Sequence, residues 1–433
     1  MGTFWSNVRG QMARFLHGNQ NDGGPPSTSS SSSLTSVDLA QGDTLPFDFD
    51  TALPMEHNYL GDNLEEVRGR NYLDDGSYQI LPLLPQPGLV LVPGQTLPLM
   101  VFYAPTMSML RNIISTSGTF GVVCVRYFEA SIPRMAHIGT TAEIYEYRDE
   151  EELRIKAKGR QRFKIINSMR QLDGNVNATV KILPEVILPS SLHGSRLLSL
   201  DRYRSEPSDK GSPANSLRLK KLEMIKHRDS MMTPWPYWVH KQYCSSRLVR
   251  RAQFHLSYLK LGSTSAGLQL PTDATELSFW VAQALPLVDE QRLLLLKLNS
   301  PIQRLRWELS VLEKCQMLCC RDCDAHVADP RDTFSMSVEG PQGTYVNPGG
   351  FVHETLTLHK AVGLRCVNED PSTEYSWFPG YAWTIAECRQ CHKHMGWKFT
   401  ATHKALKPQK FWGVCRRSIT NRLVAGDEME HVI

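Results

Sequence analysis

The sequence lacks the short motifs of several large enzyme classes. Its 433 residues contain no Gly-Lys dipeptide, which excludes a phosphate-binding P-loop, and no Gly-x-Ser-x-Gly elbow that would carry a hydrolase nucleophile. It also has no apolar run of about 18 residues, the length that a helix needs to span a membrane. The formal net charge is only +4, so the composition gives no reason to expect nucleic acid as the main partner.

A secretory signal is also missing from the first residues. Met1 to Ser6 are not followed by the apolar stretch that such a signal needs. We therefore expect a reducing compartment, in which clustered cysteines indicate metal binding rather than disulfide bonds. Residues 1–46 include a serine-rich run, Ser27 to Ser33, and few apolar side chains to offset the entropy of ordering, so they are predicted to form a disordered tail.

Residues 47–186 carry the signals of short strands. Ile80–Leu84 and Leu89–Val92 are two of several apolar runs, and Pro93-Gly94 follows the second as turn punctuation. Few helical stretches separate these runs. The pattern therefore predicts a small closed or half-closed β-structure.

Helical periodicity follows over residues 187–314, after a polar and basic stretch. Asp273 is the expected N-cap of one helix. Another helix is predicted to place four apolar residues on one face: Ile302, Leu305, Leu309 and Leu312. Residues 315–422 return to strands and turns, and 423–433 are predicted to form a tail. The expected fold class is α+β with more than one domain.

Two matched cysteine pairs predict a zinc site. Cys320 and Cys323 form one Cys-x-x-Cys turn, and Cys388 and Cys391 form a second, so four thiolates can complete the tetrahedron that zinc prefers. The 64 residues between the pairs indicate that the ion joins the ends of a small domain rather than forming a finger. Four thiolates leave no open position on the metal, so we expect one structural Zn²⁺ and no metal catalysis.

Aromatic residues gather around the second cysteine pair. Three of the nine tryptophans lie there: Trp377, Trp383 and Trp397. Pro379-Gly380 predicts a type II turn, after which Trp383 and Ile385 share one strand face, as Trp397 and Phe399 do on the next strand. Periodicity alone is compatible with an ordinary core or with a cage for a flat or cationic group.

Long blocks of this sequence resemble the cereblon family. In the cysteine-rich part the blocks are Tyr345–Pro348, Val352–Thr357, Trp377–Trp383, Gly396–Thr402 and Pro408–Gly413. In the earlier part they are Phe49–Pro54, Leu91–Pro98, Gly139–Tyr145 and Gly159–Lys164. The resemblance spans roughly residues 47 to 420 and is specific because the blocks are unbroken.

The resemblance implies a Lon N-terminal-like β-domain over 47–186 with a helical bundle over 187–314, followed by an all-β zinc-binding β-tent over 315–422. It implies that a helical insert, about 187–250, binds the damaged-DNA-binding adaptor protein of a cullin-RING ubiquitin ligase. The chain would then be a non-catalytic receptor in the cytoplasm and nucleus that presents substrate proteins for ubiquitination.

The resemblance also implies a pocket for cyclic imides of the thalidomide type, which favours the cage over the ordinary core. The residues that it assigns to this pocket are Tyr375, Trp377, Trp383, Trp397, Phe399 and Asn347. The three tryptophans would form walls, Phe399 the base, and the backbone near Tyr375 would meet the imide. Tyr375 and Gly349 stand where the family usually has histidine, so contacts at the pocket rim differ.

Two functions from other classes stay open. The β-tent resembles that of methionine sulfoxide reductases, and Cys366 and Cys415 are cysteines outside the zinc set that could serve such an enzyme. A reader of methylated lysine would use an aromatic cage with an acidic residue, for which Glu374 is the nearby candidate.

Overall fold

The computed structural model describes residues 57–61, 63–67, 72–126, 134–204, 213–258, 270–337, 339–367 and 370–423. The predicted tail 1–46, residues 424–433 of the predicted tail 423–433, and the block Phe49–Pro54 lie outside these residues.

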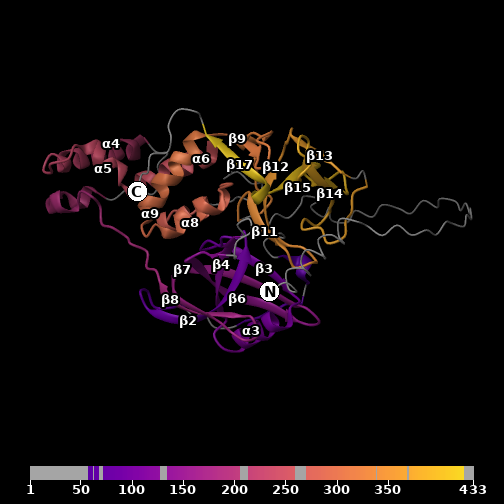
Figure 1. The fold of residues 1–433 in the computed structure, drawn as a ribbon. Helices are drawn as coiled ribbons and strands as arrows, with labels where there is room; N and C mark the ends of the chain where they lie inside the picture. Colours follow the sequence, from indigo (N-terminus) through magenta and orange to yellow (C-terminus); the bar gives the residue numbers. More distant parts are fainter. Residues whose placement is uncertain are drawn as a thin grey trace, which may run out of the picture. The chain divides into compact units, whose positions relative to one another are not determined.

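Eight strands in the first part belong to one sheet. They are β1 (Glu65–Glu66), β2 (Tyr78–Pro87), β3 (Thr96–Val101), β4 (Thr119–Arg126), β5 (Arg134–Met135), β6 (Ile138–Asp149), β7 (Leu153–Arg170) and β8 (Val176–Ile182). Figure 1 labels β2, β3, β4, β6, β7 and β8 among them. The pairing order β6-β4-β2-β8-β7 returns to β6, because β6 also pairs with β7. These five strands therefore close on themselves, which confirms the predicted closed β-structure.

The strand β4 is buried on both faces. Phe120 and Val122 pack in a cluster with Leu110 of the helix α3 (Ala104–Ser115), whereas Val123, on the opposite face, packs with Phe163 of β7. Both faces of β4 are thus covered, and the strand is apolar at nearly every position.

The prediction of a strand at Leu89–Val92 is wrong. These residues are buried but form an irregular segment between β2 and β3. Two backbone groups of this segment bond to side chains instead of to a neighbouring strand. The Thr140 hydroxyl donates to the Leu91 carbonyl at 2.6 Å, and the Val92 amide donates to Gln95 Oε1 at 3.1 Å. An apolar run alone does not distinguish these two arrangements.

Helices fill the middle of the chain. Their bounds are α4 (Pro213–Ser230), α5 (Tyr237–Gln242), α6 (Ser245–Tyr258), α7 (Ala274–Ala284), α8 (Asp289–Lys297) and α9 (Pro301–Lys314). The Asp273 carboxylate accepts hydrogen bonds from the amides of Thr275 and Glu276, which confirms it as the N-cap of α7. The four apolar residues predicted for one face of α9 are all buried, as expected.

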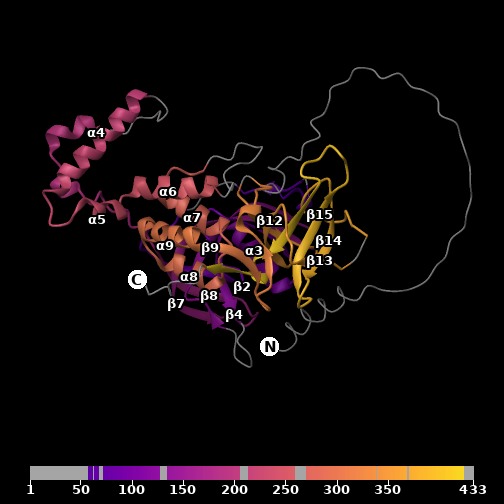
Figure 2. The same cartoon turned by 90° about the horizontal axis from the view of Figure 1, so that it is seen from above.

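The second part consists of two sheets and short 3-10 turns. One sheet has the order β10-β9-β17, with β9 (Cys315–Cys320), β10 (His326–Ala328) and β17 (Ile419–Leu423). The other has the order β11-β12-β16-β15-β14-β13, with β11 (Gln342–Val346), β12 (Val352–Leu358), β13 (Leu364–Cys366), β14 (Tyr381–Cys388), β15 (His394–Ala401) and β16 (Lys410–Cys415). Figure 2 shows β13, β14 and β15 side by side.

Short 3-10 turns complete the described elements: η1 (Asn58–Leu60), η2 (His193–Ser195), η3 (Leu198–Tyr203), η4 (Pro330–Asp332) and η5 (Arg416–Ser418). The predicted α+β fold class is confirmed: a closed β-structure with helices precedes an all-β part.

Candidate metal centre and aromatic site

The two cysteine pairs lie on turns of the same shape. In the first, Asp324 has a φ of 59° and its amide donates to the Cys320 carbonyl at 2.9 Å. In the second, His392 also has a φ of 59° and its amide donates to the Cys388 carbonyl at 3.0 Å. Each turn therefore brings its two cysteine side chains toward one point. The second turn connects the end of β14 to the start of β15.

The four thiols gather at the spacing that a zinc ion requires. Their sulfur atoms all lie within 4.8 Å of one another, with 3.7 Å between Cys320 and Cys391 and 3.6 Å between Cys323 and Cys388. A tetrahedron with Zn–S bonds of about 2.3 Å has sulfur–sulfur edges of about 3.8 Å. The donor set and its dimensions therefore fit a tetrahedral zinc ion.

Backbone amides assist ionisation at the second turn. Burial opposes ionisation there, yet the N–H groups of Cys391 and Gln390 hold the pKa of the Cys388 thiol at about 7. Burial raises the pKa of the Cys320 thiol to about 12, so this ligand needs the metal to become a thiolate.

The aromatic residues around the second turn share one sheet face, as predicted. Trp383 pairs with Phe399 and Ile385 pairs with Trp397 in the β14–β15 register. Phe399 is fully buried and stacks on Phe411 with ring centroids 4.9 Å apart, whereas Trp383 and Trp397 on the same face are half-buried. Phe399 thus provides a rigid floor, and two tryptophans stand at its edge.

Trp377 enters this group from the loop before β14. Its ring centroid lies 4.7 Å from that of Trp397, at an interplanar angle of 75°. The indole Nε1 of Trp377 donates to the Val346 carbonyl at 3.1 Å, and its ring stacks on Tyr345 at 5.0 Å. Trp377 is 6% exposed, so it acts both as core and as one side of a right-angled corner.

A short loop, Ser372–Ser376, is fixed beside this corner. Trp383 and Ser372 exchange two backbone hydrogen bonds, and the Trp383 indole donates to the Glu374 carbonyl at 2.7 Å. Tyr375 follows in a left-handed conformation with φ 51° and is 66% exposed. The loop therefore presents backbone groups near the tryptophans, while the Tyr375 side chain faces solvent.

Asn347 shapes the turn between β11 and β12. Its side-chain oxygen accepts a hydrogen bond from the Phe351 amide at 2.8 Å, and its backbone carbonyl accepts one from Gly350. It follows Val346, whose carbonyl holds Trp377. Asn347 is thus joined to the aromatic site through its neighbour, and its own amide oxygen is used within the turn.

Two histidines beside the tryptophans were not identified from the sequence. The ring of His353 lies 5.1 Å from that of Trp397 and 5.7 Å from that of Trp377, and the ring of His394 lies 5.1 Å from Trp397. Burial, with the charge of Arg417, lowers the pKa of His353 to about 3. His353 therefore joins the site as a neutral ring. The sequence offered one indication of this role: His353 lies in the Val352–Thr357 block, on the strand that pairs with Tyr345.

A cavity of about 430 Å³ adjoins the loop. It is lined by Tyr375 and by residues of the turn at Pro379-Gly380, together with Tyr59 from the first part of the chain. That turn has the predicted type II geometry, since Gly380 has a φ of 82° and the Tyr381 amide donates to the Phe378 carbonyl at 3.0 Å. Of the predicted pocket residues, Tyr375 is the one that lines this cavity.

The buried Cys415 is not an activated nucleophile. Cys415 Sγ lies 4.0 Å from His353 Nδ1, but burial raises the pKa of the Cys415 thiol to about 12. A neutral thiol beside a neutral imidazole lacks the thiolate–imidazolium character of reactive cysteines. Cys366 lies exposed on β13.

Family profiles divide the chain in two. One, described as the ATP-dependent protease La (LON) substrate-binding domain, matches residues 80–314. Another, described as Yippee zinc-binding/DNA-binding and Mis18, centromere assembly, matches residues 316–431. No helix in the described part of the chain is long and apolar enough to cross a membrane.

Curated relatives match most of the chain. A protein named "Protein cereblon" from Gallus gallus is 44% identical over 394 residues, which is 88% of this chain and 87% of the relative. The protein of the same name from Danio rerio is 43% identical and is covered over 89% of its length. A solved Lon N-terminal domain protein from Xanthomonas campestris aligns with 54% of this chain and 98% of its own, at 21% identity and a TM-score of 0.32.

Proposed function

The chain belongs to the cereblon family, and we propose that it is the substrate-recognition subunit of a cullin-RING E3 ubiquitin ligase. In this role it would bind cyclic-imide ligands or degrons through its aromatic site and present the attached proteins for ubiquitination. The transfer chemistry would belong to partner enzymes, so the chain itself would be non-catalytic. It would work in the cytoplasm and the nucleus.

One observation carries the proposal: two indoles, Trp377 and Trp397, meet edge to face at 75° beside a loop that the indole of Trp383 fixes. A cyclic imide is flat on its faces and carries hydrogen-bonding groups at its edge. Aromatic walls match such faces, and the backbone of a fixed loop matches such an edge. Because the loop is already fixed, little ordering cost remains for binding.

We propose that a single zinc ion, bound by Cys320, Cys323, Cys388 and Cys391, is structural. Four sulfur ligands saturate a tetrahedral ion and leave no position for substrate. The second cysteine turn joins β14 to β15, which carry Trp383, Trp397 and Phe399. The ion would therefore support the aromatic site mechanically.

Exposed apolar side chains in the helical region support an adaptor-binding role. Four of them follow one another closely at the end of α4 and the start of α5: Met231, Met232, Trp235 and Trp238, which are 75%, 71%, 62% and 63% exposed. Contiguous exposed apolar residues of this size are typical of protein-binding surfaces. The partner proposed for them is the damaged-DNA-binding adaptor protein.

The other two functions receive less support. A sulfoxide reductase would need a reactive cysteine, and the Cys415 thiol is buried and protonated. A methyl-lysine reader would need an acidic side chain in the cage, but Glu374 is exposed and its backbone carbonyl is the group that meets Trp383.

Co-purification of the full chain with the adaptor protein tests the receptor role. The parent chain is expected to form a stable complex, and a W235D/W238D variant is expected to lose it. I80D is the matched control, because Ile80 is 75% exposed on β2, outside the helical insert. Failure of the folded, zinc-loaded parent to bind the adaptor would contradict the proposal.

A further inference from the structure

The boundary between the two parts of the chain is polar. In each hydrophobic cluster of the described residues, the buried members lie all before residue 315 or all after it; of the partly buried residues, Val352 packs against a cluster of the first part and Tyr59 against one of the second. Across the boundary, by contrast, run hydrogen bonds and ion pairs, such as that from Gln95 Nε2 to Thr344 Oγ1 at 2.7 Å. No fully buried apolar cluster therefore spans the two parts, and the buried contacts across the boundary include many polar ones.

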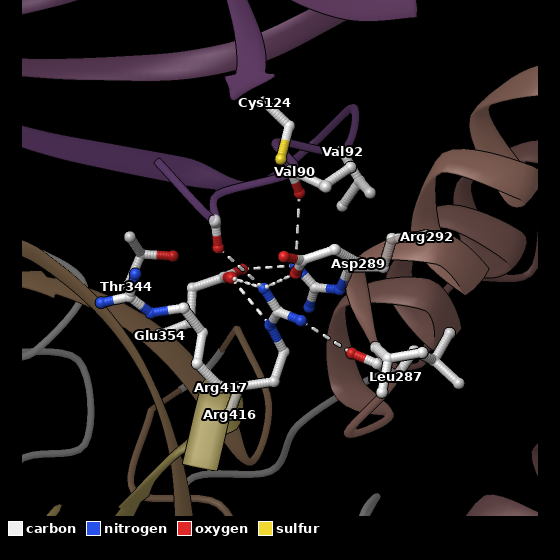
Figure 3. Close-up of polar contacts among 12 residues, drawn as sticks. Val90, Val92, Cys124, Leu287, Asp289, Arg292, Thr344, Glu354, Arg416 and Arg417 are labelled. Carbon is white, nitrogen blue, oxygen red and sulfur yellow. Dashed lines mark hydrogen bonds and ion pairs between the residues drawn. The ribbon is translucent and has the colours of Figure 1, made fainter. Parts of the chain in front are cut away.

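One carboxylate stands at the centre of these contacts. Glu354 of β12 is 6% exposed, and each of its oxygens faces a different guanidinium (Figure 3). Its Oε1 accepts from Arg292 of α8 and from Gln95, the latter at 3.1 Å. Its Oε2 accepts from Nε of Arg416 at 2.8 Å. Glu354 thus joins the second part to a helix and a loop of the first.

The two arginines are themselves shared across the boundary. Arg416 belongs to η5, yet its Nη2 lies 2.7 Å from Asp289 Oδ1 of α8, and its Nη1 donates to the Leu287 carbonyl at 2.8 Å. Arg292 also donates to the Val90 carbonyl at 3.3 Å. Because Leu89–Val92 does not pair as a strand, that carbonyl is available to Arg292.

The charges in this cluster cancel. Two guanidiniums and two carboxylates give a net charge of zero, and all four residues are at least 90% buried. Burial opposes ionisation of Glu354, but Arg292 and Arg416 hold the pKa of its carboxyl below the usual value. Four charges that cancel can be buried together. Removing one of them leaves a buried charge unpaired, which lowers the stability of the contact.

We propose that Glu354, Arg292, Arg416 and Asp289 form a charge-balanced clasp that holds residues 315–423 in one docked position against residues 57–314. In this role a single uncompensated charge releases the second part while each part keeps its own core. None of its four residues belongs to the aromatic site or to the helical segment proposed for the adaptor, so the clasp goes beyond the proposed receptor function.

The chain contains a matched control for this idea. Glu185 also lies between two buried arginines: Arg162 Nε is 2.6 Å from Glu185 Oε1, and Arg304 Nη2 is 2.5 Å from Glu185 Oε2. All three residues precede position 315, so this triad joins no residue of the second part. Removing its carboxylate imposes a similar chemical change without touching the boundary.

Small-angle X-ray scattering of the full, zinc-loaded chain tests the clasp. E354Q is expected to increase the radius of gyration and the maximum dimension, and amide hydrogen exchange over residues 88–95 is expected to become faster. E185Q is expected to leave both readouts as in the parent. The double variant E354Q/R292M is again neutral, and we expect it to return toward the parent profile, although it lacks one more side chain.

Each outcome of this experiment decides the question. A parent-like scattering profile for E354Q would overturn the clasp, and so would a double variant that is as extended as E354Q or more so. If E354Q does not fold, the neutral double variant decides in its place. A folded, compact double variant then supports charge balance, and an unfolded one overturns it.

Discussion

The indole of Trp383 and the backbone carbonyl of Glu374 are joined by a hydrogen bond of 2.7 Å. The same tryptophan exchanges backbone hydrogen bonds with Ser372, two residues earlier in the loop. One residue therefore supports the loop that leads to Tyr375 and is also a proposed wall of the imide pocket. Loss of the hydrogen bond and loss of the ring can be separated by mutation.

The variant W383F keeps an aromatic wall but loses the hydrogen bond to Glu374. A neutral hydrogen bond contributes about 1 kcal/mol, so we expect the dissociation constant for a cyclic imide to rise roughly five- to tenfold, with little change in thermal stability. Titration calorimetry measures the effect. W412F is the control, because Trp412 lies on β16 in a different cluster. Equal losses in both variants would contradict the role given to the loop.

Removal of zinc is expected to unfold the second part of the chain. Structural zinc contributes about 10–16 kcal/mol in small zinc domains, more than the stability of most domains. Chelation should therefore abolish the near-ultraviolet circular dichroism of the tryptophans in this part. C388S should lose the ion, measured by elemental analysis, while C366S should retain one zinc per chain. A folded C388S chain without zinc would show that the ion is not structural.

Gly396 is expected to tolerate no side chain. It has a φ of 142°, and a Cβ atom there would lie 2.1 Å from the Gly413 carbonyl oxygen on the neighbouring strand. We expect G396A to destabilise the second part by at least about 1–3 kcal/mol, the cost of strained backbone before the clash is added. G349A is the control, since the nearest atom to its Cβ would lie 3.4 Å away; it should change stability by about 0.5 kcal/mol or less. Equal thermal shifts in the two variants would refute the steric argument.

Glu308 of α9 makes the stability of the helical region depend on pH. Its carboxylate oxygens are buried and have no hydrogen-bond partner among the described residues, and burial raises the pKa of the group well above its usual value, against the effect of Arg304. The folded state therefore keeps a proton that the unfolded chain releases above about pH 4.5. Stability is lost as pH rises from there toward the folded pKa.

Glutamine has no proton to lose, so the advantage of E308Q over the parent is expected to grow with pH. The growth is at most about 1.4 kcal/mol per pH unit within that range. Urea unfolding at pH 5.5 and pH 8 measures it. A difference between variant and parent that stays constant or shrinks over this interval would contradict the burial of an unpaired carboxyl.

Local patterns predicted much of this molecule. The cysteine spacing identified four thiols that the fold brings within 4.8 Å, and alternation placed Trp397 and Phe399 on one face of a strand. Asp273 was recognised as an N-cap because capping depends on residues within one turn. These features depend on neighbours in sequence, which a single sequence displays directly.

Contacts between distant segments were not predictable in this way. Glu354 looked like one polar residue of an alternating strand, and its two arginines lie 62 positions away on either side. The strand wrongly predicted at Leu89–Val92 has the same cause, since the Val90 and Leu91 carbonyls have their partners on other elements, at Arg292 and Thr140. Trp377 was placed in the cage by resemblance, because neither periodicity nor composition reveals the Val346 carbonyl that holds it.

Calorimetric titration of the full, zinc-loaded chain with a simple glutarimide tests the central claim most directly. We predict saturable binding of one ligand per chain to the parent protein. W383A, which removes both the wall and the support of the loop, should abolish the binding heat while keeping its zinc. Absence of binding by a folded parent chain, or undiminished binding by W383A, would contradict the proposed imide pocket.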